Sequence, residues 1–360
     1  MIFEIFIIFL SLISLMVLHE FGHFILAKKF RVLVEEFGIG CPPRLFGKKF
    51  GSTLYSLNLL PFGAFVKIYG EEKEIKEPSS FSTKSIWQRA LIILGGVLSF
   101  WVISAVIFSI VFGIGVPQAV GDEANHNLVN PKVQIVGIVP NSPAQLKGLK
   151  IGDNIIKVQN PEFEIQKIDK VKEVQEFTNE YKGQEITLII QRGKKIFDVS
   201  LTPRESIPEG EGPIGVALSR IVITKYPWYL APIKGIETTW KTSIFIVKGL
   251  FDALLNAIRG IPTGVQVMGP IGIGTLMFQF TQLGLSYFLQ FIAIIAIYLA
   301  IFNILPIPVV DGGRLLFLLI EKFRGKPIDK KIEQNINAIF FALLIGLMIF
   351  VTIKDIARIF

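Results

Sequence analysis

Four long runs of apolar residues divide this chain into alternating hydrophobic and polar segments. The runs lie near Ile2–Ala27, Ala90–Val116, Tyr287–Leu305 and Ala338–Ile353. An α-helix needs about 20 predominantly apolar residues to cross the hydrocarbon core of a bilayer. The pattern therefore predicts a polytopic α-helical membrane protein with about four transmembrane helices.

Basic residues gather after the first and third spans, and they indicate the orientation in the membrane. They are Lys28, Lys29, Arg31, Arg44, Lys48 and Lys49, and then Lys322, Arg324, Lys326, Lys330 and Lys331. Cytoplasmic loops carry an excess of Lys and Arg, so both loops are predicted to be cytoplasmic. Both termini and the long segment between the second and third spans then lie outside. The first span has no basic segment before it and ends in lysines, so we expect it to be retained rather than removed as a signal peptide.

An apolar segment with strand character follows the first span. Thr53–Gly70 is rich in aromatic and β-branched residues and has Pro61 and Gly63 near its middle, a pattern typical of a β-hairpin. The segment is too apolar for water, and backbone edges at membrane depth need protein or a cavity around them. We therefore predict a re-entrant membrane hairpin beside the first span, whose edge could hold an extended substrate. The alternative is a cytoplasmic hairpin that rests on the membrane surface.

The segment Val133–Pro203 has the composition of a soluble α+β domain. Strands are predicted at Val133–Val139, Ile155–Val158, Ile186–Arg192 and Ile196–Leu201, with a helix at Val171–Tyr181. This order, together with Asn141-Ser142-Pro143-Ala144 and Gly148 to Asp153, resembles a PDZ domain. The resemblance implies recognition of peptide ends or extended segments, or exclusion of bulky substrates. The alternative is a spacer without a ligand.

These patterns divide the chain into four parts. Residues 1–120 form a membrane core with two spans and the hairpin, 130–206 the extracytoplasmic PDZ domain, 207–286 a linker, and 287–360 a second membrane core. Within the linker, Ser206–Pro227 has some extended segments. Trp240–Ile258 is amphipathic and is predicted to lie at the membrane interface.

Composition agrees with a membrane protein and excludes other classes. The chain has 360 residues, of which 51% are hydrophobic, and its mean hydropathy is +0.56. The net charge of +8 does not indicate nucleic-acid binding, because the basic residues lie beside the apolar spans. The single cysteine, Cys41, permits no intrachain disulfide and no thiolate metal cluster, and is read as a loop thiol.

Two histidines and a glutamate interrupt the first apolar span. They form the sequence His19-Glu20-Phe21-Gly22-His23. Histidines four residues apart share one helix face and can bind one zinc ion, while Glu20 beside them can act as a general base. Ionisable residues at membrane depth indicate a functional site. His19 precedes Lys28 by nine residues, or about 13 Å of helix, so the site should open toward the cytoplasmic half.

A catalytic zinc ion takes three protein ligands and a water molecule, so one ligand is missing. His126 lies outside in the loop after the second span and is read as a surface residue. Glu35 and Glu36 follow the basic helix end and are read as solvated loop charges. Asp311 is a lone carboxylate in the broken apolar segment Asn303–Gly313, and interrupted helices at membrane depth often form sites. We favour Asp311 as the third ligand, while a cap of the helix that follows is the alternative.

Together these motifs resemble the site-2 proteases, a family of zinc intramembrane metalloproteases, and within it the bacterial RseP-type branch with a single PDZ domain. The resemblance covers essentially the whole chain. The motifs are His-Glu-Phe-Gly-His at 19–23, Asn-x-Leu-Pro-x-Pro-x-x-Asp-Gly-Gly at 303–313, Pro-Phe-Gly-Ala-Phe-Val-Lys at 61–67 and Gly-Pro-Ile-Gly at 269–272. In the second span, Ser99 stands where many members carry Asn.

The resemblance implies a mechanism and a set of partners. It implies that His19, His23 and Asp311 bind Zn²⁺ and that Glu20 moves the proton of the attacking water. Substrate contacts would come from Asn303, for which a polar contact between helices is the alternative, and from Gly63 and Phe65 in the hairpin. The implied location is the bacterial cytoplasmic (inner) membrane. The implied substrates are single-span membrane proteins already cut outside, such as anti-sigma factors, or signal-peptide remnants.

Two other functions fit parts of the pattern. A catalytically silent membrane scaffold could use the PDZ domain to bind protein tails, but it would not need Glu20. A zinc transporter would need polar residues along several spans, whereas candidate ligands lie in only two.

Overall fold

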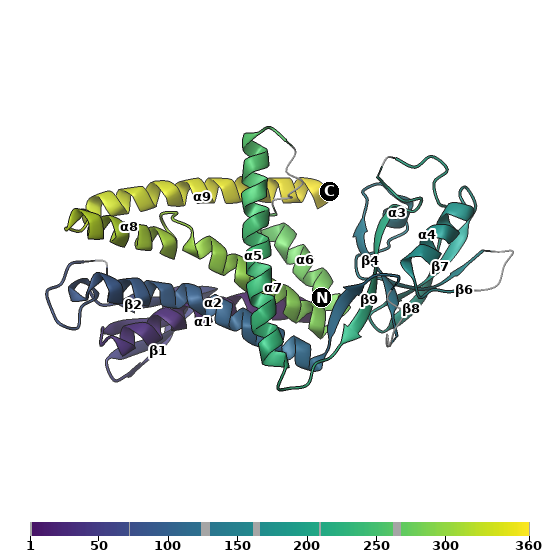
Figure 1. The fold of residues 1–360 in the computed structure, drawn as a ribbon. Coiled ribbons are helices and arrows are strands. Elements are labelled where there is room, and N and C mark those ends of the chain that lie inside the picture. The colour runs from purple at the N-terminus through teal and green to yellow at the C-terminus, as the bar shows by residue number, and fades with distance from the viewer. Residues whose placement is uncertain are drawn as a thin grey trace. The chain divides into compact units, whose positions relative to one another are not determined.

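The computed structural model describes residues 2–71, 73–123, 130–160, 166–208, 210–261 and 268–359, and separates them into two compact units (Figure 1). The first unit contains Met1–Ile110, Ala231–Phe278 and Gln290–Phe360. The second contains Val111–Leu230 and Gln279–Leu289. His126, predicted to be a surface residue, lies outside the described residues.

Four helices in the described part of the chain are long and apolar enough to cross a membrane. They are α1 (Ile2–Lys29), α2 (Ile86–Ile114), α7 (Leu285–Ile304) and α9 (Lys330–Ile359). Their positions match the four predicted spans, although α9 begins eight residues before the predicted Ala338. The prediction of four helices able to span a membrane is confirmed.

Helices α1 and α2 approach each other closely at two glycines. A Cβ atom on Gly95 would lie 2.7 Å from the backbone oxygen of Gly22, so only glycine fits at this crossing. Small residues allow such close packing between helices in membranes, where lipid provides no hydrophobic driving force. The contact fixes α2 beside the part of α1 that carries the histidines.

The first unit also contains a small sheet made by β1 (Val34–Phe50) and β2 (Thr53–Ile68). Both strands bend back on themselves, because Gly38 pairs with Phe65 on one side and with Ser56 on the other, and Ser56 pairs in turn with Gly47. The register gives four neighbouring segments in the order 64–68, 34–41, 53–60 and 44–50. The predicted hairpin therefore forms only half of a larger sheet.

Glu35, Glu36 and Cys41 were predicted to lie in a loop. That prediction was wrong, because all three lie in β1. Glu35 forms an ion pair of 2.9 Å with Lys67, and Glu36 forms one of 2.9 Å with Arg44. These charges are paired across the sheet rather than simply solvated. Cys41 is an exposed residue of the same strand.

The short 3₁₀ helix η1 (Phe81–Thr83) precedes α2. Helix α5 (Ala231–Ile258) packs against α2 through small residues. Trp101 of α2 donates to the hydroxyl of Ser243, and Gly235 lies against the backbone of Ala105. The remaining helices of this part are α6 (Pro270–Leu283) and α8 (Asp311–Arg324). The amphipathic segment predicted at Trp240–Ile258 lies within α5, which also presents a large exposed apolar face.

The second unit is built around one antiparallel sheet of seven strands, accompanied by two short helices (Figure 1). Its strands lie in the order β3 (Val116–Val120), β9 (Val216–Thr224), β4 (Lys132–Ile138), β5 (Asn154–Gln159), β7 (Ile186–Arg192) and β8 (Lys195–Leu201), with β6 (Gln166–Lys167) paired to β5. The helices are α3 (Pro143–Leu146) and α4 (Val171–Glu180). Each element predicted for Val133–Pro203 is present within a few residues of its predicted position.

Strand β9 lies in the segment predicted as a linker, and β3 overlaps the predicted end of the second span. Strand β9 occupies an inner position, where Val133 pairs with Arg220 on one side and Ala119 pairs with Ile221 on the other. These pairings join residues about a hundred positions apart. The compact unit is therefore larger than the predicted 130–206, because its first and last strands pair with each other.

Candidate metal centre

Helix α1 presents two buried imidazoles on one face. His19 and His23 are 5% and 4% exposed, and their Nε2 atoms are 3.4 Å apart. The spacing of four residues places both rings on the same side of the helix, one turn apart. Helix α1 alone therefore places two candidate nitrogen ligands, the Nε2 atoms of the two histidines, close to each other.

Asp311 reaches the same point from the beginning of α8. Helix α7 ends at Ile304 and α8 begins at Asp311, so a short irregular segment separates them. A Cβ atom on Gly312 or Gly313 would collide with the backbone of Ile304–Pro308, which means that these glycines let the start of α8 pack directly on that segment. The Oδ2 atom of Asp311 lies 3.4 Å from Nε2 of His19 and 3.3 Å from Nε2 of His23.

Asp311 does not occupy the cap position of α8, which was the alternative role considered for it. Val310 occupies the cap position of α8 and makes no side-chain capping bond, while Asp311 already belongs to the first turn. Its carboxylate is 7% exposed and faces the histidines. The structure therefore brings together all three residues predicted as metal ligands.

A hydrogen bond determines which nitrogen of the His23 ring carries a proton. Nδ1 of His23 lies 2.9 Å from the backbone oxygen of Ile92, which can only accept, so Nδ1 carries the proton and donates it. In the neutral ring, Nε2 then presents a lone pair. Oδ2 of Asp311 is buried and has no hydrogen-bond partner among the described residues. Unpaired acceptors that face one another in a buried site are costly unless a cation lies between them.

The separations of these three atoms agree with a zinc site. Zinc bonds to nitrogen and oxygen of about 2.0–2.1 Å in a tetrahedron place neighbouring ligand atoms about 3.3–3.4 Å apart. The three observed separations are 3.4, 3.4 and 3.3 Å. The residues therefore fit a tetrahedral zinc ion with three protein ligands and one open position, which is the arrangement of catalytic sites.

The surroundings leave little freedom to the two rings. The ring of His19 stacks on Phe100, with centroids 4.6 Å apart and an angle of 17° between the planes. Gly96 lies against both imidazoles, and a Cβ atom there would collide with Nε2 of His23 and lie 2.7 Å from Cε1 of His19. Helix α2 thus provides both a stacked aromatic ring and a close glycine contact.

Replacing Gly96 with alanine should therefore disrupt the centre. The added methyl group would displace the imidazole of His23, so we expect Gly96→Ala to lose the ability to bind zinc. Gly113→Ala is the matched control in the same helix, because a Cβ atom there meets nothing within 4 Å. Alanine is a better helix former by about 1 kcal/mol, so the control should fold at least as well as the parent. Zinc content by elemental analysis checks the expectation, and a Gly96→Ala protein with full zinc would contradict it.

Glu20 lies beside the centre and is half-buried. Besides His23 and Asp311, the charged groups of Arg314 and Glu71 lie close enough to act on its carboxylate. The carboxylate of Glu71 raises the pKa of Arg314 above its ordinary value, so Arg314 is a permanent cation next to the site. Sequence reasoning missed Arg314, although its position three residues after Asp311 places it on the same side of α8.

The other residues singled out from the sequence are described by the conformation and contacts of their own helix or sheet. Asn303 donates to the backbone oxygen of Leu299 in its own helix, at 2.8 Å. Gly63 adopts a φ of +76°, and Phe65 lies over Gly38 in the sheet. Ser99 donates to the backbone oxygen of Gly96 one turn earlier, at 2.6 Å.

Comparison with known proteins relates the chain to zinc metalloproteases. The model of peptidase family M50 matches residues 6–347. A Clostridium perfringens protein assigned by name to the zinc metalloproteases is 35% identical over 348 residues, which cover 96% of each chain. The proteins named zinc metalloprotease RasP in Oceanobacillus iheyensis and Geobacillus kaustophilus are each 28% identical, with 95–96% of this chain and 96% of theirs covered.

These findings confirm the prediction of a zinc metalloendopeptidase of the site-2 protease type. The match extends over both units and over the positions of the histidines and Asp311. The chain belongs to peptidase family M50.

Proposed function

We propose that this chain cleaves the transmembrane segments of membrane proteins within the bilayer, with zinc held by His19, His23 and Asp311. The observation that carries the proposal is the meeting of three buried ligand atoms at zinc-like separations, two from α1 and one from α8. Helix α1 is apolar enough to span a membrane, so the two histidines belong to a candidate membrane span.

The residues of the site have separate tasks in this reaction. When bound, zinc lowers the pKa of water and polarises the scissile carbonyl group. Glu20 accepts the proton of the attacking water and returns it to the leaving amine, as a general base and then a general acid. Nδ1 of His23 is held by the carbonyl of Ile92, which keeps Nε2 directed toward the site.

We further propose that the sheet of β1 and β2 enters the membrane beside α1. Two contacts support this arrangement: Lys28 near the end of α1 donates to Thr53 at 2.7 Å, and the ring of Phe9 contacts Phe62 with centroids 5.7 Å apart. Phe9 and Lys28 are separated by about 28 Å of helix, close to the thickness of the hydrocarbon core. A sheet that follows α1 over this length would lie alongside the span rather than rest on the surface.

The outer edge of this sheet is a suitable place for an extended substrate. Segment 64–68 pairs with 34–39 on one side, and no strand of the described residues pairs with its other side. Strand addition to such an edge would hold an unwound transmembrane segment through backbone hydrogen bonds. Gly63 and Phe65 lie at this edge, and Asn303 is proposed as a further backbone contact.

The second unit is proposed to act as a single PDZ domain outside the cytoplasm. A pocket of about 330 Å³ lies between α4 and β9, with Val174, Thr178 and Val216 among its lining residues. Strand β3 pairs with Arg220–Thr224 only, which leaves one edge of Val216–Ser219 without a partner among the described strands. A peptide end could be received there, or the unit could restrict access to bulky proteins.

Reporter fusions test the proposed orientation in the bacterial inner membrane. We expect fusions within Lys132–Leu201 to report an extracytoplasmic position, and fusions after Gly325 a cytoplasmic one, because basic residues follow the first and third spans. Alkaline phosphatase and green fluorescent protein fusions measure the two sides. The opposite pattern would reverse the topology and place the metal centre in the other half of the membrane.

The full chain in proteoliposomes with zinc tests the function directly. Single-span membrane proteins lacking their extracytoplasmic domain, of the anti-sigma factor or signal-peptide-remnant type, are the proposed substrates. Mass spectrometry should find new termini within their apolar segment. Cuts confined to the water-soluble part of the substrate would contradict intramembrane cleavage, and binding without any cut would favour a silent scaffold.

A further inference from the structure

Arg314 lies between two carboxylates, one of which belongs to the metal centre. Its Nη1 atom is 3.0 Å from Oε1 of Glu71 and 4.0 Å from Oδ1 of Asp311. The other oxygen of Asp311, Oδ2, faces the two histidines. One oxygen of the Asp311 carboxylate therefore faces the metal centre, and the other faces the guanidinium of Arg314.

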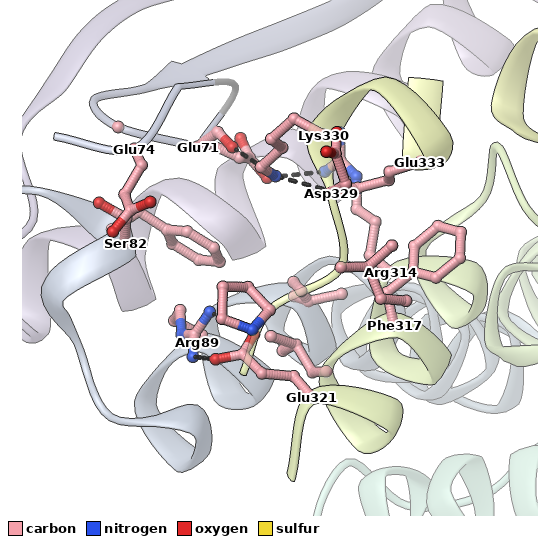
Figure 2. A pocket seen from close by; sticks show the side chains of 16 residues that line it. Glu71, Glu74, Ser82, Arg89, Arg314, Phe317, Glu321, Asp329, Lys330 and Glu333 are labelled. Atoms are coloured by element: carbon pink, nitrogen blue, oxygen red, sulfur yellow. Dashed lines mark hydrogen bonds and ion pairs between the residues drawn. The ribbon is translucent and has the colours of Figure 1, made fainter. Parts of the chain in front are cut away.

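Glu71 is held in a loop that is tied to its surroundings. The loop follows β2, and the backbone of Tyr69 donates to Leu33 at 2.9 Å and accepts from Phe81 at 2.8 Å. The ammonium group of Lys330 donates to the backbone oxygen of Glu71 at 3.3 Å. Glu71, Arg314 and Lys330 all line a pocket of about 490 Å³. Figure 2 labels these three side chains.

We propose that Arg314 is a positioning residue for Asp311 and that Glu71 holds Arg314 in place, an inference that rests on the proposed function. Arginine is always charged, and the 3.0 Å ion pair with Glu71 fixes the direction of its planar fork, so its charge can attract and orient Oδ1 of Asp311 across 4.0 Å, a distance beyond a hydrogen bond. Without Glu71, the guanidinium could close on Asp311, bind both of its oxygens and compete with zinc. With Glu71, the cation is kept at 4.0 Å and Oδ2 stays available.

The positioning role and a simple charge effect predict opposite changes in zinc affinity when Arg314 is removed. Removing a cation near the centre leaves Glu71 unbalanced, and electrostatics alone would then tighten the binding of Zn²⁺. Removing a group that orients a ligand instead weakens metal binding, typically by about 10- to 100-fold. The sign of the change in zinc affinity therefore separates the two explanations.

The test measures zinc affinity of the detergent-solubilised full chain by chelator competition. We expect Arg314→Ala to bind Zn²⁺ about 10- to 100-fold more weakly, and Arg314→Lys to recover part of the loss because it keeps the charge but not the fork. Cleavage by Arg314→Ala should return when buffered free zinc is raised by the same factor. Glu71→Ala should weaken zinc binding in the parent but change it less than twofold in Arg314→Ala, since Glu71 acts through Arg314.

The pocket offers a matched control. Arg89 and Glu321 form a second ion pair there, with both side chains mostly buried, and Glu321 lies on the same helix as Arg314 (Figure 2). Arg89→Met should lower thermal stability and leave zinc affinity unchanged, which separates a folding defect from a loss of positioning. Unchanged or tighter zinc binding by Arg314→Ala, with the parent still binding and cleaving, would overturn this inference alone. A parent that binds no zinc would overturn the proposed function first.

Discussion

Glu20→Gln is expected to keep its zinc and lose its activity. Glutamine has nearly the same shape as glutamate but cannot accept a proton from water. General acid–base catalysis contributes about 10²- to 10⁴-fold to the rate, so cleavage of a single-span substrate should fall by that factor. The three candidate ligands are untouched, so metal content should not change. Quantitative cleavage in proteoliposomes, with elemental analysis of the same preparation, measures both.

Two further variants define the role of Glu20. Glu4 lies about 24 Å away on the same helix, and Glu4→Gln should retain activity if the effect is local. Glu20→Asp keeps the carboxylate but draws it back by one methylene group, so its activity should fall between those of the parent and Glu20→Gln. Full activity in Glu20→Gln would remove this residue from the mechanism and leave the source of the base open.

A slow or inactive Glu20→Gln protein also provides a means to identify substrates. Substrate that reaches the site but is not cut should remain bound longer and co-purify with the variant. Mass spectrometry of proteins retained by Glu20→Gln, compared with those retained by the Gly96→Ala protein, separates substrates that need an intact centre from proteins that bind elsewhere.

Much of the candidate metal centre could be predicted from the sequence because its signals are local. His19 and His23 are four residues apart on a helix that apolar composition alone defines. Asp311 stood out because it is a lone carboxylate in a broken apolar segment and the two histidines lacked a third ligand. The distance between the two segments along the chain did not matter, since the histidines lay in one predicted span and Asp311 followed the end of another.

The elements that escaped prediction depend on distant partners. Strand β9 lies after a Pro- and Gly-containing stretch, and its place in the sheet comes from pairing with β3 and β4, far earlier in the chain. Segment 34–50 carries several charges and Pro42-Pro43, which suggested a loop, yet pairing with 53–68 makes it a strand. The ion pair of Arg314 with Glu71 joins residues more than two hundred positions apart, which no local pattern reveals.

Asp311→Ala is expected to lose zinc and activity together. The substitution removes one of three protein ligands and leaves two imidazoles on one helix, a set too small for a catalytic zinc site. The loss of affinity should exceed the about 10- to 100-fold that removal of an outer partner costs. Because zinc that binds the folded state stabilises it, added zinc should raise the melting temperature of the parent but not that of Asp311→Ala.

Two companion variants make the result specific to the carboxylate of Asp311. Asp311→Asn keeps the shape of the side chain but removes its charge, so it should also lose zinc if ligation rather than packing is at stake. Glu321→Gln removes a carboxylate from the same helix, where it pairs with Arg89, and should retain zinc. An Asp311→Ala protein with its full zinc content would show that the third ligand lies elsewhere. The closeness of Oδ2 to both imidazoles, at 3.4 and 3.3 Å, would then need a different explanation, such as a hydrogen bond to a protonated histidine.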